Sequence, residues 1–123
     1  MNEKAFNLED RLVEFAVRAI NVVESLPDTR AGNHIAGQLV RSGTSPAPNY
    51  GEAQSAESRK DFIHKMKVCL KELRETLIWL KIIVRKQLCS ADRLGSILQE
   101  CNELIAIFVS SIQTAEKKLR SAA

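Results

Sequence analysis

The chain has 123 residues, of which 45% are hydrophobic and 27% are charged, and its formal net charge is +3. A chain of this length can bury a core, so we expect a single domain over residues 1–123. The small numbers of glycine, proline and aromatic residues favour helices over strands. The chain lacks any run of about 18 uncharged apolar residues, and its N-terminus MNEKAFNLEDR is charged where a signal peptide is apolar. These features predict a cytoplasmic protein that makes no contact with membranes.

The first predicted helix carries apolar residues at alternating steps of four and three. They are Leu8, Leu12, Phe15, Ala19, Val22 and Leu26. This spacing is typical of a helix that lies nearly parallel to its neighbours in a bundle. We expect Pro27 and Asp28 to end the helix.

The second segment is too short, taken alone, to match the others. Residues 32–41 offer about three helical turns, and the stretch RSGTSPAPNYGEA that follows has the composition of a loop. Ser45 followed by Pro46 nevertheless has the residue order of an N-cap and a first helical position. We therefore expect a second helical piece over residues 45–56, which makes one helix that is kinked near Ser42–Ser45.

The third and fourth helices are long. Apolar residues from Ile63 to Val84 alternate steps of three and four, and Ser58 has the pattern of an N-cap before them. A similar pattern follows Ser90 and continues to Leu119. Four helices of comparable reach predict an all-α fold, an antiparallel up-and-down four-helix bundle.

Basic residues are concentrated on the third helix. Residues 58–86 hold nine lysines and arginines against three acids. With Ile63 at heptad position a, the e and b positions form one stripe beside the core seam, and acids are absent from it. Such a stripe can follow a phosphate backbone. The predicted nucleic-acid contacts are Lys60, Lys67, Lys71, Arg74, Lys81 and Arg85.

Two other interpretations of this stripe stay open. Lysines on a solvated helix often serve solubility alone, although acids are then usually interspersed. The stripe could also contact a protein partner. Aromatic residues that could stack on bases are missing from its positions, which argues against sequence-specific recognition of single strands.

Apolar residues also lie outside the core seam of the third helix. Phe62, Cys69 and Ile83 are expected to be covered by neighbouring helices of the same chain. Three further apolar residues lie outside the seam, Val68, Ile78 and Ile82. They would leave an exposed patch in a monomer, so we expect them at a homo-oligomer interface.

Polar residues recur along one face of the kinked second helix. Arg41, Ser45, Asn49 and Glu52 follow at spacings of four, four and three. We interpret them as a buried structural network in which Arg41 bonds Glu52 or Glu75, while Ser45 and Asn49 satisfy backbone groups freed by the kink.

The residue inventory argues against an enzyme. The only histidines, His34 and His64, have no partner carboxylate or cysteine at a useful spacing, and a glycine-rich phosphate loop is missing. Three cysteines without a CxxC pair predict no metal site and no disulfide framework, and Cys69 and Cys101 fit the core pattern. We expect no cofactor, no metal and no catalytic residue.

Residues 38–83 resemble the proteins encoded in intervening sequences of bacterial 23S ribosomal RNA genes, which are sometimes called ribosomal proteins. The matching residues are Gln38, Leu39, Arg41, Ser42, Gly43, Thr44, Ser45, Asn49, Tyr50, Glu52, Ala53, Ser58, Asp61, Phe62, Ile63, Glu72, Glu75, Thr76, Leu77, Trp79 and Leu80. The sequence departs from the family pattern at Pro46 and Pro48.

This resemblance implies an up-and-down bundle that assembles as a ring, a pentamer, with nucleic-acid contacts and no catalytic activity. Relatives also serve as accessory proteins of reverse transcriptases. Two functions therefore stay open, a binder of nucleic acid, RNA first, and an adaptor that docks a nucleic-acid enzyme.

Overall fold

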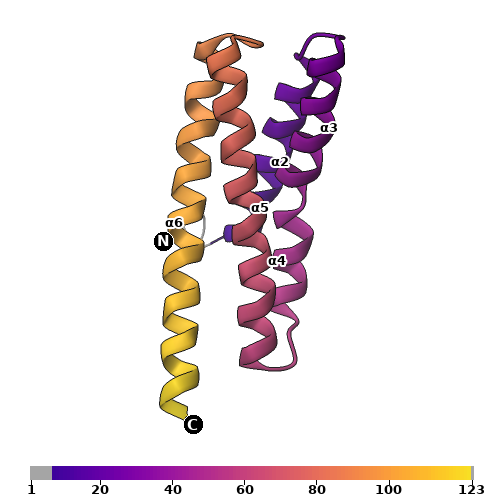
Figure 1. Cartoon of the computed structure of the whole chain (residues 1–123). Helices are drawn as coiled ribbons and strands as arrows, with labels where there is room; N and C mark the ends of the chain where they lie inside the picture. Colours follow the sequence, from indigo (N-terminus) through magenta and orange to yellow (C-terminus); the bar gives the residue numbers. More distant parts are fainter. Residues whose placement is uncertain (1–6, 123) are drawn as a thin grey trace.

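A computed structural model describes residues 7–122 of the chain. Its helices are α2 (Leu8–Glu24), α3 (Arg30–Thr44), α4 (Pro46–Gln54), α5 (Arg59–Lys86) and α6 (Ala91–Ala122). Helices α3 and α4 follow one another along one line, so the molecule consists of four antiparallel rods (Figure 1). The predicted all-α four-helix bundle is confirmed. Within the described range, no helix is long and apolar enough to cross a membrane.

The second rod is bent where the kink was predicted, but the bend is slight. Ser45 separates α3 from α4, yet its backbone stays helical at φ −66° and ψ −39°. Its N–H still donates to the Arg41 carbonyl at 3.1 Å, and its carbonyl accepts from the Asn49 N–H at 3.2 Å. Pro46 and Pro48 interrupt the ladder because neither ring nitrogen can donate a hydrogen bond. Ser45 lies at the predicted N-cap position with Pro46 directly after it, but its side chain makes no capping bond.

Helices α3 and α5 each begin at a polar side chain that caps them, and one of these caps, Ser58, was predicted from the sequence. The Ser58 hydroxyl accepts from the Asp61 N–H at 3.0 Å, and the Thr29 hydroxyl accepts from the Gly32 N–H at the same distance. Helix α5 ends because Gln87 adopts a left-handed conformation, with φ at 58°, and the Leu88 N–H then bonds the Ile83 carbonyl. The turn that begins at Gln87 reverses the chain, so the long helices α5 and α6 run in opposite directions.

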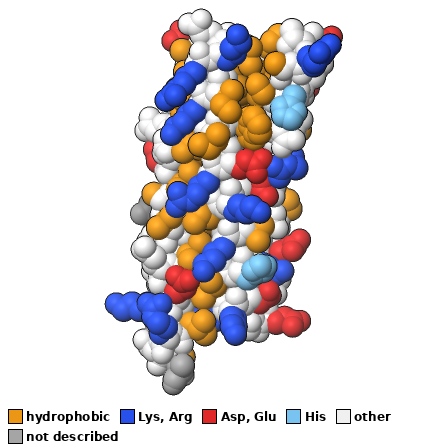
Figure 2. Space-filling view, viewed as in Figure 1, with side chains coloured by type: hydrophobic (Ala, Val, Ile, Leu, Met, Phe, Trp, Pro, Cys, Tyr) orange, Lys and Arg blue, Asp and Glu red, His pale blue; other side chains and the backbone are white. Residues whose placement is uncertain are grey.

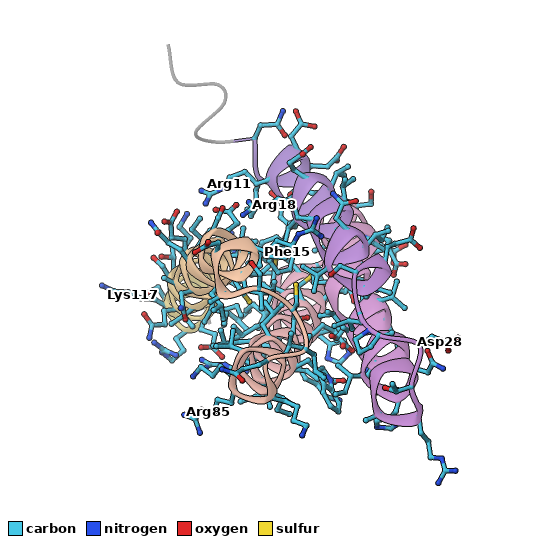
Figure 3. All side chains as sticks on the ribbon, turned by 90° about the horizontal axis from the view of Figure 1, so that it is seen from above. Arg11, Phe15, Arg18, Asp28, Arg85 and Lys117 are labelled. Atoms are coloured by element: carbon cyan, nitrogen blue, oxygen red, sulfur yellow. The ribbon has the colours of Figure 1, made fainter. Side chains whose placement is uncertain are left out.

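The core lies along the seam predicted from the heptads. Its fully buried members include Phe15 from α2, Leu39 from α3, Leu73 from α5 and Phe108 from α6. Figure 3 shows Phe15 pointing into the space between the helices. The apolar flank of α5 is covered within the chain as expected, since Cys69 and Ile83 are fully buried and Phe62 is half-buried.

The buried polar atoms in the middle of the bundle satisfy each other. Ser42 on α3 and Thr76 on α5 are both fully buried, and their hydroxyl oxygens lie 2.9 Å apart in a hydrogen bond. The Thr76 hydroxyl also reaches the Glu72 carbonyl at 2.8 Å. This hydrogen bond joins α3 to α5 one turn before the bend, and it avoids the free-energy cost of burying hydroxyl groups without a partner.

The three cysteines differ in exposure, which predicts different reactivity. Burial raises the pKa of Cys69 and of Cys101 to about 12, so only about one thiol in 10⁴ is ionised at pH 8. Cys89 lies half-buried in the turn after α5. We expect iodoacetamide at pH 8 to alkylate Cys89 far faster than the other two in the folded protein, and all three at similar rates in urea. Peptide mass spectrometry measures the three rates, and equal rates in the folded protein would contradict the packing.

Candidate nucleic-acid interface

The basic stripe lies on the solvent side of α5. Helices α3 and α4 pack against one flank of α5 and α6 packs against the other, so its e and b positions remain outside the core. All six predicted residues are exposed, as is His64 between them. Figure 2 shows lysine and arginine side chains spaced along this face, with hydrophobic side chains between them. Arg85 points away from the bundle when it is viewed along its axis (Figure 3).

Most of the stripe is not neutralised by neighbouring acids. Lys67 forms an ion pair with Glu116 of α6 at 3.0 Å. Among residues 7–122, the remaining five predicted contacts have no carboxylate within ion-pair distance. Their charges are therefore not held in ion pairs and are available to an anionic ligand, although Lys71 also helps to lower the pKa of the Glu75 carboxyl.

A second basic cluster lies beside the start of α5, and the sequence analysis missed it. Because α5 and α6 are antiparallel, the end of α6 lies next to the beginning of α5 (Figure 1). Two adjoining shallow clefts of about 380 and 620 Å³ lie there, and Arg59, Thr114 and Lys118 line both. Lys117 lines the larger cleft and points into solvent (Figure 3). We call Arg59, Lys117 and Lys118 the lower-end cluster.

The lower-end cluster extends the stripe from α5 onto a second helix. Lys60, the first member of the stripe, directly follows Arg59. The lining also supplies hydroxyl groups from Thr114 and Ser121 and one face of Phe62. Cations and hydroxyls together are the groups that bind phosphate oxygens. The sequence signal was the run KKLR at residues 117–120, which gains meaning only once the antiparallel packing is known.

The predicted network is wrong as a single buried unit, although the predicted contact between Arg41 and Glu75 is confirmed. Arg41 is 49% exposed and reaches across to α5, where it donates to Glu72 at 3.0 Å and to Glu75. The Trp79 indole N–H also donates to Glu75 at 3.2 Å. The Arg41 guanidinium, followed by that indole, lowers the pKa of the Glu75 carboxyl. This cluster is a surface contact between α3 and α5.

The remaining members of that network make separate contacts. The Asn49 side chain donates to the Ser45 hydroxyl at 2.8 Å and to the Ser45 carbonyl at 2.9 Å, within one helical turn at the bend. The Glu52 side chain is 65% exposed and lies 3.7 Å from Lys65 of α5. Arg41 and Glu52 are three turns apart on a bent rod, so each pairs with the part of α5 that lies beside it.

The residues predicted at an oligomer interface lie within or beside the stripe. Ile78 is 54% exposed, Ile82 is 39% exposed and Val68 is half-buried. Ile78 and Ile82 are one turn apart and have Arg74, Lys81 and Arg85 around them. This surface therefore mixes apolar and basic side chains, and its covering by a second chain stays a prediction.

Known proteins that are similar to this chain identify its family. The family model described as "23S rRNA-intervening sequence protein" matches residues 5–110. A solved crystal structure from Bacteroides thetaiotaomicron, of a protein with unknown function from the S23 ribosomal protein family, is 36% identical. The similarity covers 85% of this chain and 96% of the other, with a TM-score of 0.79. A search among curated proteins finds no match. By sequence and by fold, the chain belongs to the 23S rRNA-intervening sequence protein family.

Proposed function

We propose that this chain is a non-enzymatic, cytoplasmic homo-oligomer, a pentameric ring, that binds RNA through the basic stripe of α5. The observation that carries the binding is the row of exposed cations, five of which form no ion pair with a described residue, and its continuation into the lower-end cluster on α6. The choice of RNA rests on the family name. The ring rests on the resemblance and on the exposed apolar residues of α5.

The proposed contacts are electrostatic and do not read bases. Each phosphate that a lysine or arginine neutralises releases bound counterions, so affinity should fall steeply as salt rises. Stacking groups do not line the stripe between Lys60 and Arg85, where Ile78 is the apolar member. The binding should therefore tolerate changes of sequence and respond to the shape and charge of the ligand.

Charge removal from the stripe and from the lower-end cluster tests this function. We expect Lys60→Gln combined with Lys117→Gln, at the lower end of the basic surface, to flatten the slope of log affinity against log salt by about 0.9 unit per lost contact for duplex nucleic acid. Both residues are exposed and unpaired, so the melting temperature should stay within about 2 °C of the wild type. Fluorescence anisotropy with a labelled RNA hairpin and a DNA duplex, from 50 to 200 mM salt, measures the slopes.

A matched control separates the stripe from total charge. Arg30→Gln combined with Arg93→Gln removes two exposed cations from the opposite end of the bundle and should leave the slope unchanged. If the wild type binds neither probe at about 50 mM salt, where phosphate contacts are strong, or if both double variants behave alike, the stripe is merely solvated. The adaptor function, in which α5 docks a protein such as a reverse transcriptase, would then replace RNA binding.

A further inference from the structure

Helix α2 has a second apolar strip on the side that faces away from the core. Leu12, Phe15, Ala19 and Val22 are the buried side of the helix. On the opposite side Val13, Val17 and Ile20 are 47%, 44% and 40% exposed, at spacings of four and three. These three residues, the α2 strip, are adjacent on one face of a helix. No described residue of the chain covers them, although the strip has the size and spacing of a packing surface.

The α2 strip is surrounded by acids. Glu9, Asp10, Glu14 and Glu24 are all exposed on the same side of α2. The two arginines of the helix turn the other way: Arg11 forms an ion pair with Glu100 of α6 at 2.7 Å, and Arg18 bonds Ser96 of α6 (Figure 3). The exposed face of α2 is therefore apolar in the middle and negative around it.

The exposed face of α5 has the complementary character. We call its apolar residues Val68, Ile78 and Ile82 the α5 strip. Four lysines and arginines surround the strip, and the nearby acid Glu75 is already paired with Arg41 of α3. The cations are Lys71, Arg74, Lys81 and Arg85. A surface of this kind fits the α2 face both by apolar contact and by charge.

The two faces lie where neighbouring copies could use both. Seen along the bundle, α2 and α5 occupy opposite corners, with α3 between them (Figure 3). Both helices run in the same direction (Figure 1). A Cβ added at Gly43 of α3 would lie 2.7 Å from the Ala19 Cβ and 3.9 Å from the Thr76 Cγ2, so Ala19 and Thr76 are at the same height. Along the bundle axis, the α2 strip (residues 13–20) extends from about 9 Å below the level of Ala19 and Thr76 to about 2 Å above it. The α5 strip (residues 68–82) extends from about 12 Å below the same level to about 9 Å above it.

We propose that the α2 strip of one copy docks on the α5 strip of the next copy. The two surfaces differ, so the contact is head-to-tail and each copy keeps one free face to continue the assembly. Parallel helices at equal height need no axial shift between copies, which favours a closed ring over a filament. The inference rests on the homo-oligomer of the proposed function and names the surface that completes it.

This docking divides the basic stripe into two parts. The acids around the α2 strip meet Arg74, Lys81 and Arg85, which flank Ile78 and Ile82. Helix α2 begins at Leu8, about 16 Å below the level of Ala19, whereas Lys60 lies about 24 Å below that level, so Lys60 and the lower-end cluster lie beyond the reach of α2. The lower part of each copy therefore stays open to nucleic acid after assembly.

Complementary face-blocking variants test the docking. One variant carries Val17→Gln and Ile20→Gln, the other carries Ile78→Gln and Ile82→Gln, and Ala106→Gln on the exposed side of α6 is the control. All five positions are exposed and glutamine suits helices, so folding should be unaffected. Light scattering at 100 μM should give a multiple of the 13.7 kDa chain for the wild type and the control, and the monomer mass for each double variant.

An equimolar mixture of the two double variants distinguishes this contact from a symmetric one. One variant retains an intact α5 strip and the other an intact α2 strip, so the mixture should form a heterodimer and stop there. If only the α5 variant dissociates, or if the mixture stays monomeric, α2 is not the partner surface and the docking is overturned while the oligomer stands. A monomeric wild type would overturn the docking and the ring, whereas RNA binding is decided separately by the salt slopes.

Discussion

Replacement of Phe108 by alanine is expected to lower the free energy of unfolding by about 3 to 5 kcal/mol. Phe108 lies on α6 and is fully buried. Its ring meets Tyr50 of α4 edge to face, with ring centres 6.0 Å apart. Truncation would remove this contact and leave a cavity where α4, α5 and α6 meet, and the long rods cannot easily close it.

Urea denaturation of the wild type and of two variants measures this effect. Phe108→Leu retains most of the buried volume and should cost less than about 2 kcal/mol. A Phe108→Ala variant that unfolds within about 1 kcal/mol of the wild type would show that the α4–α6 contact is loose. Tyr50 and Phe108 place this ring contact between the second and fourth rods, below the bend.

The long helices could be predicted well because their apolar spacing is regular. The seam from Leu94 to Ala115 corresponds to buried residues throughout. In the seam from Ile63 to Leu80, Leu70 and Leu77 are only half-buried. Ser58 caps α5 as predicted, because a short polar side chain before an acidic first turn satisfies local backbone donors whatever lies nearby. These are local properties that the sequence states directly.

Contacts between helices were harder to predict. The sequence left Glu52 or Glu75 as the partner of Arg41; the arginine bonds Glu75, and also Glu72, which was not predicted. The axial alignment of neighbouring helices decides which side chains meet, and a single sequence does not reveal this alignment. At Ser45, the order serine then proline is typical of a helix start, yet the flanking hydrogen bonds hold the residue inside a continuous rod.

The candidate site was predicted in part. The stripe on α5 lies at the solvent surface as its heptad positions indicate, because a core at the a, d and g positions leaves e and b outside. The lower-end cluster needed the antiparallel pairing of α5 with α6. The α2 strip was present in the sequence at spacings of four and three, but it stands out only once the opposite side is seen to hold the core.

Replacement of each of three helical glycines by alanine is expected to change the stability of the protein in different directions. Gly37, Gly51 and Gly43 all lie inside helices, where alanine is intrinsically better by up to about 1 kcal/mol. A Cβ at Gly37 or at Gly51 would meet nothing within 4 Å, so alanine at either position should stabilise the fold by about 0.5 to 1 kcal/mol. A Cβ at Gly43 would lie 2.7 Å from the Ala19 Cβ, closer than two carbons can approach.

We therefore expect Gly43→Ala to destabilise the protein by about 1 to 3 kcal/mol, the opposite sign to its two controls. Both neighbours are backbone-anchored, so neither Cβ can swing aside, and α2 must move away from α3. Ala19→Gly in the same chain returns the space, and the double variant should be more stable than Gly43→Ala despite the cost of glycine in α2. Thermal and urea unfolding of Gly43→Ala, Ala19→Gly and the double variant measure the coupling. If Gly43→Ala stabilises the protein as Gly37→Ala does, α2 and α3 are not in close contact at this point, and the common height of Ala19 and Thr76 on which the ring geometry depends is lost with it.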